Sequence, residues 1–258
     1  MKKKIVLGLA AAGTALAMLP MLAAFEAHVI NVTARIENAL SVSTKVLDFG
    51  TVFPQEHLAQ NVGVKLSDSF IAEDRVDDVE YFIRQKPKCA ITRDEGKSFD
   101  PTNTRTGHVN VDDGKAVIDC GQPPRQLESG ESWGVLPSLC EYVSKDGEKD
   151  DEDLQGGVDG ITPSFHKPWQ IVNNAVVWLD TKGRLAKSAQ DVVDEWVIDL
   201  SVPCFGGYCA QDWEKFVHDI NPNAVASEYT QPIANEHKIF GCDLWIEVSD
   251  VSEKQLPE

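Results

Sequence analysis

The sequence of 258 residues lacks the motifs of the common hydrolases and nucleotide-binding enzymes. It contains no HExxH zinc-protease motif, no GxSxG nucleophile motif, no glycine-rich phosphate loop and no paired zinc-ligand motif. Its carboxylates are too many for their spacing to single out an acid–base pair. The sequence therefore predicts no catalytic residue, no cofactor and no metal site, and we interpret the protein as a non-enzyme.

One short fragment has the form of a catalytic motif. Residues 164–167 read SFHK, in which Ser164 and Lys167 have the spacing of a serine nucleophile and its lysine base. The companion motifs of that chemistry are absent, and Pro163 and Pro168 flank the fragment. We therefore interpret it as part of a loop.

Basic residues are scarce. The chain has 24 lysines and arginines against 41 aspartates and glutamates, which gives a formal net charge of −17. Such a surface repels phosphate backbones, so nucleic acid is not expected as a partner. The charge suits solubility, the binding of divalent cations or a salty environment, and the sequence does not choose between these.

The long apolar run lies at the start of the chain. Lys2, Lys3 and Lys4 precede an uncharged stretch over residues 5–24, which is typical of a secretory signal peptide. We expect cleavage after Ala24, which leaves 234 residues with a charge of about −20. An uncleaved anchor is the alternative. Either way the rest of the chain is expected outside the cytoplasm, secreted or at the cell surface, with membrane contact only through the leader.

All six cysteines lie beyond this leader. An even number in an exported chain predicts three disulfides, and the sequence leaves all fifteen connectivities open. The alternative is a zinc site at the loosely spaced CFGGYC fragment, residues 204–209. The disulfide candidates are Cys89, Cys120, Cys140, Cys204, Cys209 and Cys242.

Residues 28–40 organise our interpretation of the chain. Their side chains alternate between apolar and mainly polar, as in a half-buried strand whose apolar face carries Ile30, Val32, Ala34, Ile36 and Leu40. A strand this close to a new amino terminus is tied down at one end only. It can complete its own sheet or pair with a sheet edge of another molecule. Asn31 begins a glycosylation sequon on the polar face.

The rest of the chain alternates short strand patterns with polar loops. Strands are expected at residues 45–50, 60–70, 79–86, 115–120, 176–180, 196–202 and 240–248, with one helix over residues 210–220. Pro87 is expected to end the third strand, and the polar residues 93–114 are expected to form a loop. The acidic stretch 145–160 is expected to be a solvated loop, with a calcium loop as the alternative. The predicted fold class is all-β, a jelly-roll-like antiparallel β-sandwich with long loops and one short α-helix, preceded by a signal peptide. The expected division is a leader at 1–24, a donor segment at 25–40 and one sandwich domain at 41–258.

Four fragments, read in order, resemble the TasA and camelysin family and its archaeal bundling-pilus relatives. They are FEAHVINVTARIENAL, LDFGTVFPQE, VEYFIRQKPK and the terminal GCDLWIEV. The resemblance implies a secreted jelly-roll subunit that lends its amino-terminal strand to a neighbour. No zinc-ligand set that the camelysin label would require is found here. The likeness covers roughly the first 86 residues and the last strands.

The sequence therefore predicts a secreted structural subunit that assembles by donor-strand exchange into a pilus or biofilm-matrix fibre. Its partner is itself, in a head-to-tail homopolymer, with divalent cations as a further possibility. Two alternatives stay open at this point. One is a monomeric carbohydrate- or calcium-binding β-sandwich module, in which tryptophans stack on sugars, and the other is a secreted camelysin-like metalloprotease.

Overall fold

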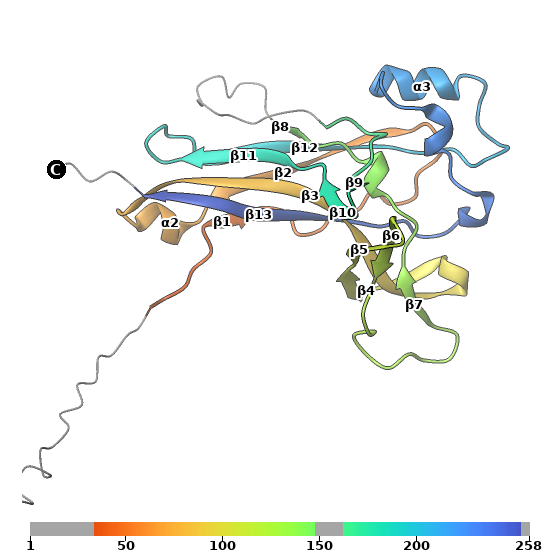
Figure 1. Ribbon diagram of the computed structural model, residues 1–258, viewed down its shortest axis with the longest axis horizontal. Helices are drawn as coiled ribbons and strands as arrows, with labels where there is room; N and C mark the ends of the chain where they lie inside the picture. Colours follow the sequence, from red (N-terminus) through yellow and green to blue (C-terminus); the bar gives the residue numbers. More distant parts are fainter. Residues whose placement is uncertain (1–33, 148–161, 254–258) are drawn as a thin grey trace, which may run out of the picture. The chain divides into compact units, whose positions relative to one another are not determined.

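The computed structural model describes residues 34–147 and 162–253 and shows an all-β protein built from antiparallel sheets (Figure 1). The chain divides into two units, Met1–Ile36 and Glu37–Glu258, and the sheets belong to the second. The leader and Asn31 lie outside the described residues, as does all of the acidic stretch from residue 148 onward. The predicted all-β fold class is confirmed for the described part of the chain.

The strands and helices follow one another in a simple order. The strands are β1 (Leu40–Val42), β2 (His57–Leu66), β3 (Val76–Arg93), β4 (Ser98–Thr106), β5 (His108–Asp112), β6 (Lys115–Asp119), β7 (Ser132–Val135), β8 (Asp146–Gly147), β9 (Trp169–Val172), β10 (Ala175–Trp178), β11 (Thr181–Ala186), β12 (Val193–Ser201) and β13 (Cys242–Glu253). The helices are α2 (Asp68–Ala72) and α3 (Trp213–Ile220), with short 3₁₀ turns that include η3 (Cys140–Tyr142).

Two sheets enclose the main core. The first has the strand order β1-β2-β12-β8, and the second is built on β11-β3-β13. Buried residues from both sheets form one apolar cluster, as expected for a sandwich. The long strand β3 also leaves this sandwich, and its last residues pair with β4 and β7. Two small hairpins, β5-β6 and β9-β10, complete the sheets.

A polar contact joins the two sheets at the centre of the core. The Tyr81 hydroxyl on β3 donates to Asp194 on β12, and the Trp196 indole nitrogen donates to the Tyr81 oxygen at 2.7 Å. Burial raises the pKa of Tyr81, with the Asp194 carboxylate as the next cause. Gly183 on β11 makes room for this ring, because a Cβ there would lie 2.4 Å from the Tyr81 ring.

The six cysteines form three disulfides, which confirms the sequence prediction. The pairs are Cys89–Cys120, Cys140–Cys242 and Cys204–Cys209. The third pair uses both sulfurs of the CFGGYC fragment, so the zinc alternative at that fragment is wrong. Three disulfides fit an oxidising, non-cytoplasmic compartment.

Several expected elements differ from the structure. Residues 45–50 form no strand, although Leu47 and Phe49 still pack against the core. The strand expected to reach residue 70 ends at Leu66, because the Ser67 side chain caps the short helix α2 by accepting from the Phe70 amide. The polar stretch 93–114, expected as a loop, contains all of β4 and β5.

Strand β3 does not end at Pro87, as the sequence analysis expected. Pro87 lies inside the strand, opposite Cys242. This is the last position at which β3 pairs with β13, and the next residues pair with β4 and β7 instead. A proline, which lacks a backbone N–H, is tolerated at such a change of partner. The expected helix is present in a shorter form, as α3.

Candidate functional site: the amino-terminal arm and the outer edge of β13

The structure describes only part of the predicted donor strand. Ile30 and Val32 lie outside the described residues. Ala34 and Ile36 are exposed and belong to no strand, and the exposed fraction of the Ile36 side chain is 93%. The prediction of a strand over residues 28–40 is therefore wrong for residues 34–39, which form no strand within this chain. We call residues 28–36 the arm.

Leu40 has a different environment from the other predicted donor residues. It begins β1 and pairs with Leu66 of β2 in the chain's own first sheet. Its side chain is half-buried and packs against the main core. Leu40 is thus part of the parent sandwich.

The outer edge of β13 has no partner strand among the described residues. On its inner side β13 pairs with β3 in an unbroken register over residues 242–248, after which two bulges interrupt the ladder. Within the described part of the chain, the only β-bridge to its outer side is at the preceding residue, Gly241, which pairs with Ser138. Unpaired N–H and C=O groups along such an edge are a template for another strand.

The inward face of this edge is apolar. Leu244 and Ile246 are half-buried and pack against the main core, while Trp245 and Glu247 point to the outer face and are exposed. A strand added beside β13 would continue the same layer of inward side chains. Alternation between apolar and polar residues in the added strand would match this pattern.

The connection between the sheets places β13 on the border of the sandwich opposite the β11–β12 turn. β11 leads into β12 through a tight turn, in which Ala186 and Asp191 exchange backbone hydrogen bonds of 2.8 and 3.1 Å. That turn closes one border. The outermost strands on the opposite border are β1 and β13 (Figure 1). β1 is only three residues long, and the chain that follows it forms no strand before His57, although Leu47, Phe49 and Val52 in that segment pack against the core.

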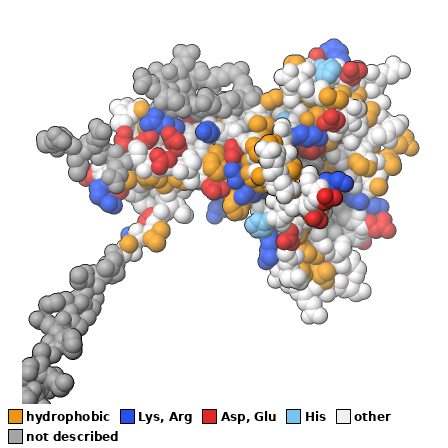
Figure 2. Space-filling model, in the orientation of Figure 1, with side chains coloured by type: hydrophobic (Ala, Val, Ile, Leu, Met, Phe, Trp, Pro, Cys, Tyr) orange, Lys and Arg blue, Asp and Glu red, His pale blue; other side chains and the backbone are white. Residues whose placement is uncertain are grey.

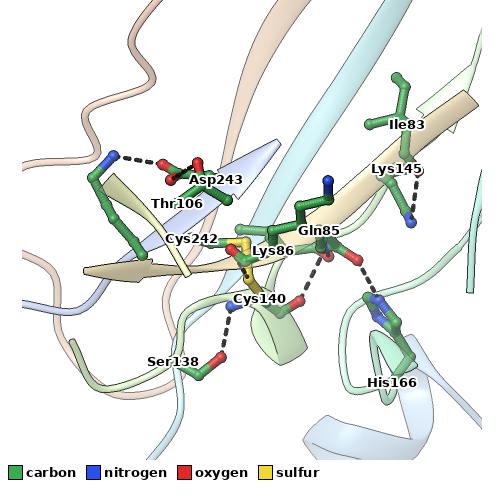
Figure 3. Close-up of a disulfide and its surroundings, with 12 residues drawn as sticks. Ile83, Gln85, Lys86, Thr106, Ser138, Cys140, Lys145, His166, Cys242 and Asp243 are labelled. Atoms are coloured by element: carbon green, nitrogen blue, oxygen red, sulfur yellow. Dashed lines mark hydrogen bonds and ion pairs between the residues drawn. A yellow bond between two sulfur atoms is a disulfide. The ribbon is translucent and has the colours of Figure 1, made fainter. Parts of the chain in front are cut away.

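A buried network of hydrogen bonds around the Gln85 side chain holds strand β3 in place (Figure 3). The Gln85 side-chain nitrogen donates to the Cys140 and Val143 carbonyls at 3.0 and 2.7 Å, and its oxygen lies 2.6 Å from His166 Nε2. Burial lowers the pKa of His166 to about 3, with the nearby Lys145 charge as a second cause and the Pro163 carbonyl opposing the shift.

Lys145 is a fully buried cation, although the sequence analysis placed it at the start of a solvated loop. Its ammonium donates to the Leu179 carbonyl at 3.0 Å and to the Ile83 carbonyl at 3.4 Å. Burial lowers its pKa to about 8. Sequence reasoning missed this network because its members come from distant segments, and a lone lysine beside an acidic run resembles a surface residue.

We expect the Lys145→Met substitution to stabilise the protein at pH 7 and to flatten its alkaline stability profile. The unfolded lysine titrates near 10.5 and the folded one near 8, so the unfolded state binds more protons between these values. In the wild type the free energy of unfolding therefore rises with pH, by about 2 kcal/mol between pH 7 and 9.5. Denaturant unfolding across this range measures the effect.

Lys215→Met is the matched control, because Lys215 is an exposed lysine on α3 paired with Asp219. It removes the same charge from the surface and should leave the pH profile unchanged. A Lys145→Met profile that keeps the wild-type slope would contradict the assignment.

The SFHK fragment, residues 164–167, does not bring a serine nucleophile and a lysine base together. The Ser164 hydroxyl is buried and lies 2.8 Å from the Tyr142 carbonyl, to which it donates. Lys167 extends to Glu141 and Glu228, at 3.6 and 3.7 Å. Burial raises the pKa of Glu141. Within residues 34–147 and 162–253, no three His, Cys, Asp or Glu side chains are grouped to hold a metal ion.

No helix in the described part of the chain has the length and apolar character needed to cross a membrane. Comparisons of the chain with protein-family models, with curated proteins and with solved structures found no match. The resemblance to the TasA and camelysin family therefore stays a prediction from the sequence.

Proposed function

We propose that this protein is a secreted structural subunit that polymerises by donor-strand exchange into an extracellular filament, a pilus or a biofilm-matrix fibre. One observation carries the proposal: an alternating arm whose described apolar residues are exposed occurs in the same chain as a sheet edge that has no partner strand among residues 34–147 and 162–253. The arm of one subunit would pair with the outer edge of β13 in the next.

The lengths of the two segments agree. The unbroken register of β13 spans residues 242–248, and the alternating apolar part of the arm spans residues 30–36. Seven residues on each side form a complete ladder. In this pairing the apolar face of the arm covers the core beside Leu244 and Ile246, and its polar face points outward.

The burial supplies enough free energy for a stable joint. Ile30, Val32 and Ile36 each contribute roughly 1.5–3 kcal/mol when fully buried, and Ala34 contributes less. The backbone ladder adds hydrogen bonds to groups that are otherwise solvated. Arm and edge are different surfaces, so the contact is head-to-tail and does not close on itself. Repetition of such a contact produces a fibre.

Two further features support an extracellular filament. The disulfides fit an oxidising compartment, and they hold the subunit together while its edge is open. The large negative charge keeps free subunits apart in solution and leaves room for divalent cations to join finished fibres.

Electron microscopy of the purified protein beginning at residue 25 tests the proposal. We expect regular fibres from this form and only soluble, folded subunits from a form beginning at residue 37. Circular dichroism and intact disulfides establish that the shorter form is folded. Fibres from the shorter form, or a strictly monomeric longer form at every concentration and salt tested, would overturn donor-strand exchange through the arm.

A further inference from the structure

A pocket of about 480 Å³ lies on the outer face of the second sheet, away from the inward face that donor-strand exchange would use. Its volume falls within the range of small-molecule sites. The pocket forms where β3 passes β13, β10 and the β4–β5 connection. Figure 2 shows acidic and basic side chains interspersed over the face in view, so no large region there carries a single sign of charge.

The charged side chains that line the pocket are all basic. Arg84, Lys86 and Arg105 take part in the lining, and no carboxylate does among the residues that the structure describes. Arg84 is already neutralised, because its guanidinium donates to both Asp180 oxygens at 2.8 and 2.7 Å. Lys86 and Arg105 form no ion pair with any described residue. The carboxylates of Glu247 and Asp180 act on Lys86 from outside the lining, so it is the lining itself that is positive.

The position of Lys86 is fixed, and its charge is incompletely compensated. Its ammonium lies 3.3 Å from the centroid of the Trp245 ring, a cation–π contact. Burial lowers its pKa, and the charge of Glu247 opposes that shift. Burial has removed part of the water that would hydrate this ammonium. An anion bound beside it would replace the lost interaction.

Two tryptophans supply flat apolar surface beside these cations. The exposed fraction of Trp245 is 43%, and its indole nitrogen donates to the Thr106 hydroxyl at 3.2 Å, which fixes the ring. Trp178 from β10 makes two contacts that hold its ring. The Arg84 guanidinium carbon lies 5.0 Å from the centroid of the Trp178 ring, and Trp169 packs against that ring in an edge-to-face contact. Rigid indole faces of this kind pack against the C–H face of a sugar ring.

The β4–β5 connection is held rigidly against the pocket. Gly107 is buried there, and a Cβ at this position would lie 2.8 Å from Ile118 and 3.1 Å from the Cys89 sulfur. The Cys89–Cys120 disulfide ties β3 to the residue after β6 on the same side. The backbone of Thr106 and His108, which flank this glycine and line the pocket, is therefore braced, and such preorganisation favours binding.

We propose that this pocket binds an acidic saccharide, with a uronic acid carboxylate held by Lys86 and Arg105 and the sugar ring on the exposed part of the Trp245 indole that the Lys86 ammonium leaves uncovered. A uronic acid carries one carboxylate and an apolar ring face in a single unit, which matches the two free cations beside an indole. A nucleotide also combines a flat ring with an anion, and adenosine monophosphate is therefore the competing ligand in the test below. The proposal is independent of filament formation.

Calorimetric titration of the protein beginning at residue 37 with trigalacturonate tests the proposal, because this form keeps the pocket and lacks the arm. The methyl ester of the same trisaccharide is the matched ligand without charge. We expect the acid to bind at least about tenfold more tightly than the ester, because charge-assisted hydrogen bonds are lost in the ester. Equal affinities, or no binding of the acid at millimolar concentration, would overturn the proposal.

Lys86→Gln and Lys65→Gln form the matched pair of variants. Lys65 is an exposed lysine on β2 in the other sheet, so its loss changes the net charge equally but leaves the pocket intact. We expect Lys86→Gln to weaken trigalacturonate binding about tenfold and Lys65→Gln less than twofold. Equal weakening by both variants would show only a general charge effect and would overturn the site.

Trp245→Leu separates a saccharide site from a simple anion site. It should weaken trigalacturonate much more than inorganic phosphate, because phosphate loses only the ring that positions Lys86, whereas the saccharide also loses its stacking surface. Adenosine monophosphate that binds more tightly than trigalacturonate would overturn the choice of ligand in favour of a nucleotide.

Discussion

Val32→Asp is expected to abolish filament formation, whereas Val29→Asp is expected to leave it intact. The two residues are identical and three positions apart, and the alternation of the arm places them on opposite faces. In the proposed joint Val32 enters the apolar layer beside β13, so the substitution loses its burial, worth about 1.5–3 kcal/mol, and also places a carboxylate in an apolar environment. Val29 stays in solvent.

Negative-stain micrographs and sedimentation of the polymer measure the difference. Both variants change the charge by the same amount, and both keep the Asn31 sequon, because neither alters Asn31 or Thr33. Equal loss of fibres in the two variants would point to the added charge itself. Normal fibres from Val32→Asp would show that the alternation of the arm is not used for assembly.

Removing the Cys140–Cys242 disulfide by a double substitution to alanine is expected to lower the free energy of unfolding by about 5 kcal/mol. This bond closes a loop with a sequence separation of 102 residues, and it anchors the start of β13 to the buried η3 turn. Without it, the unfolded chain gains conformational entropy, and the edge proposed as the acceptor loses its attachment at residue 242.

The Cys204–Cys209 disulfide is the internal control, because its sequence separation is only 5 residues. The same alanine substitutions there should cost about 2 kcal/mol in the loop-entropy model. Denaturant unfolding without reductant gives both values. A larger loss at Cys204–Cys209 than at Cys140–Cys242 would show that local packing, and not loop closure, dominates the stability of this fold.

Local periodicity in the sequence predicted several strands and the one longer helix correctly. The alternation over residues 196–202 and 240–248 corresponds to β12 and β13, and the i, i+3, i+4, i+7 spacing after residue 210 corresponds to α3. The same reasoning failed for residues 45–50 and, within this chain, for residues 34–39. Alternation shows that a segment suits a strand, but a strand also needs a neighbour with free backbone groups.

The features most relevant to function could not be predicted in this way. The free edge of β13 depends on strand order, which no single segment encodes. The pocket joins Lys86, Arg105, Trp178 and Trp245 from four different strands. Lys145 follows the same rule, since its buried ammonium meets the carbonyls of Ile83 and Leu179, which are distant in sequence, whereas its sequence context is that of a solvated loop.

The sequence by itself determined the fold class, the presence of three cysteine pairs and the alternation of the arm, because composition and local periodicity depend only on near neighbours along the chain. Only the tertiary structure decided which cysteines pair, which sheet edge is left open and which cations meet beside tryptophan. These depend on contacts between residues far apart in sequence, and such contacts exist only once the two sheets have packed.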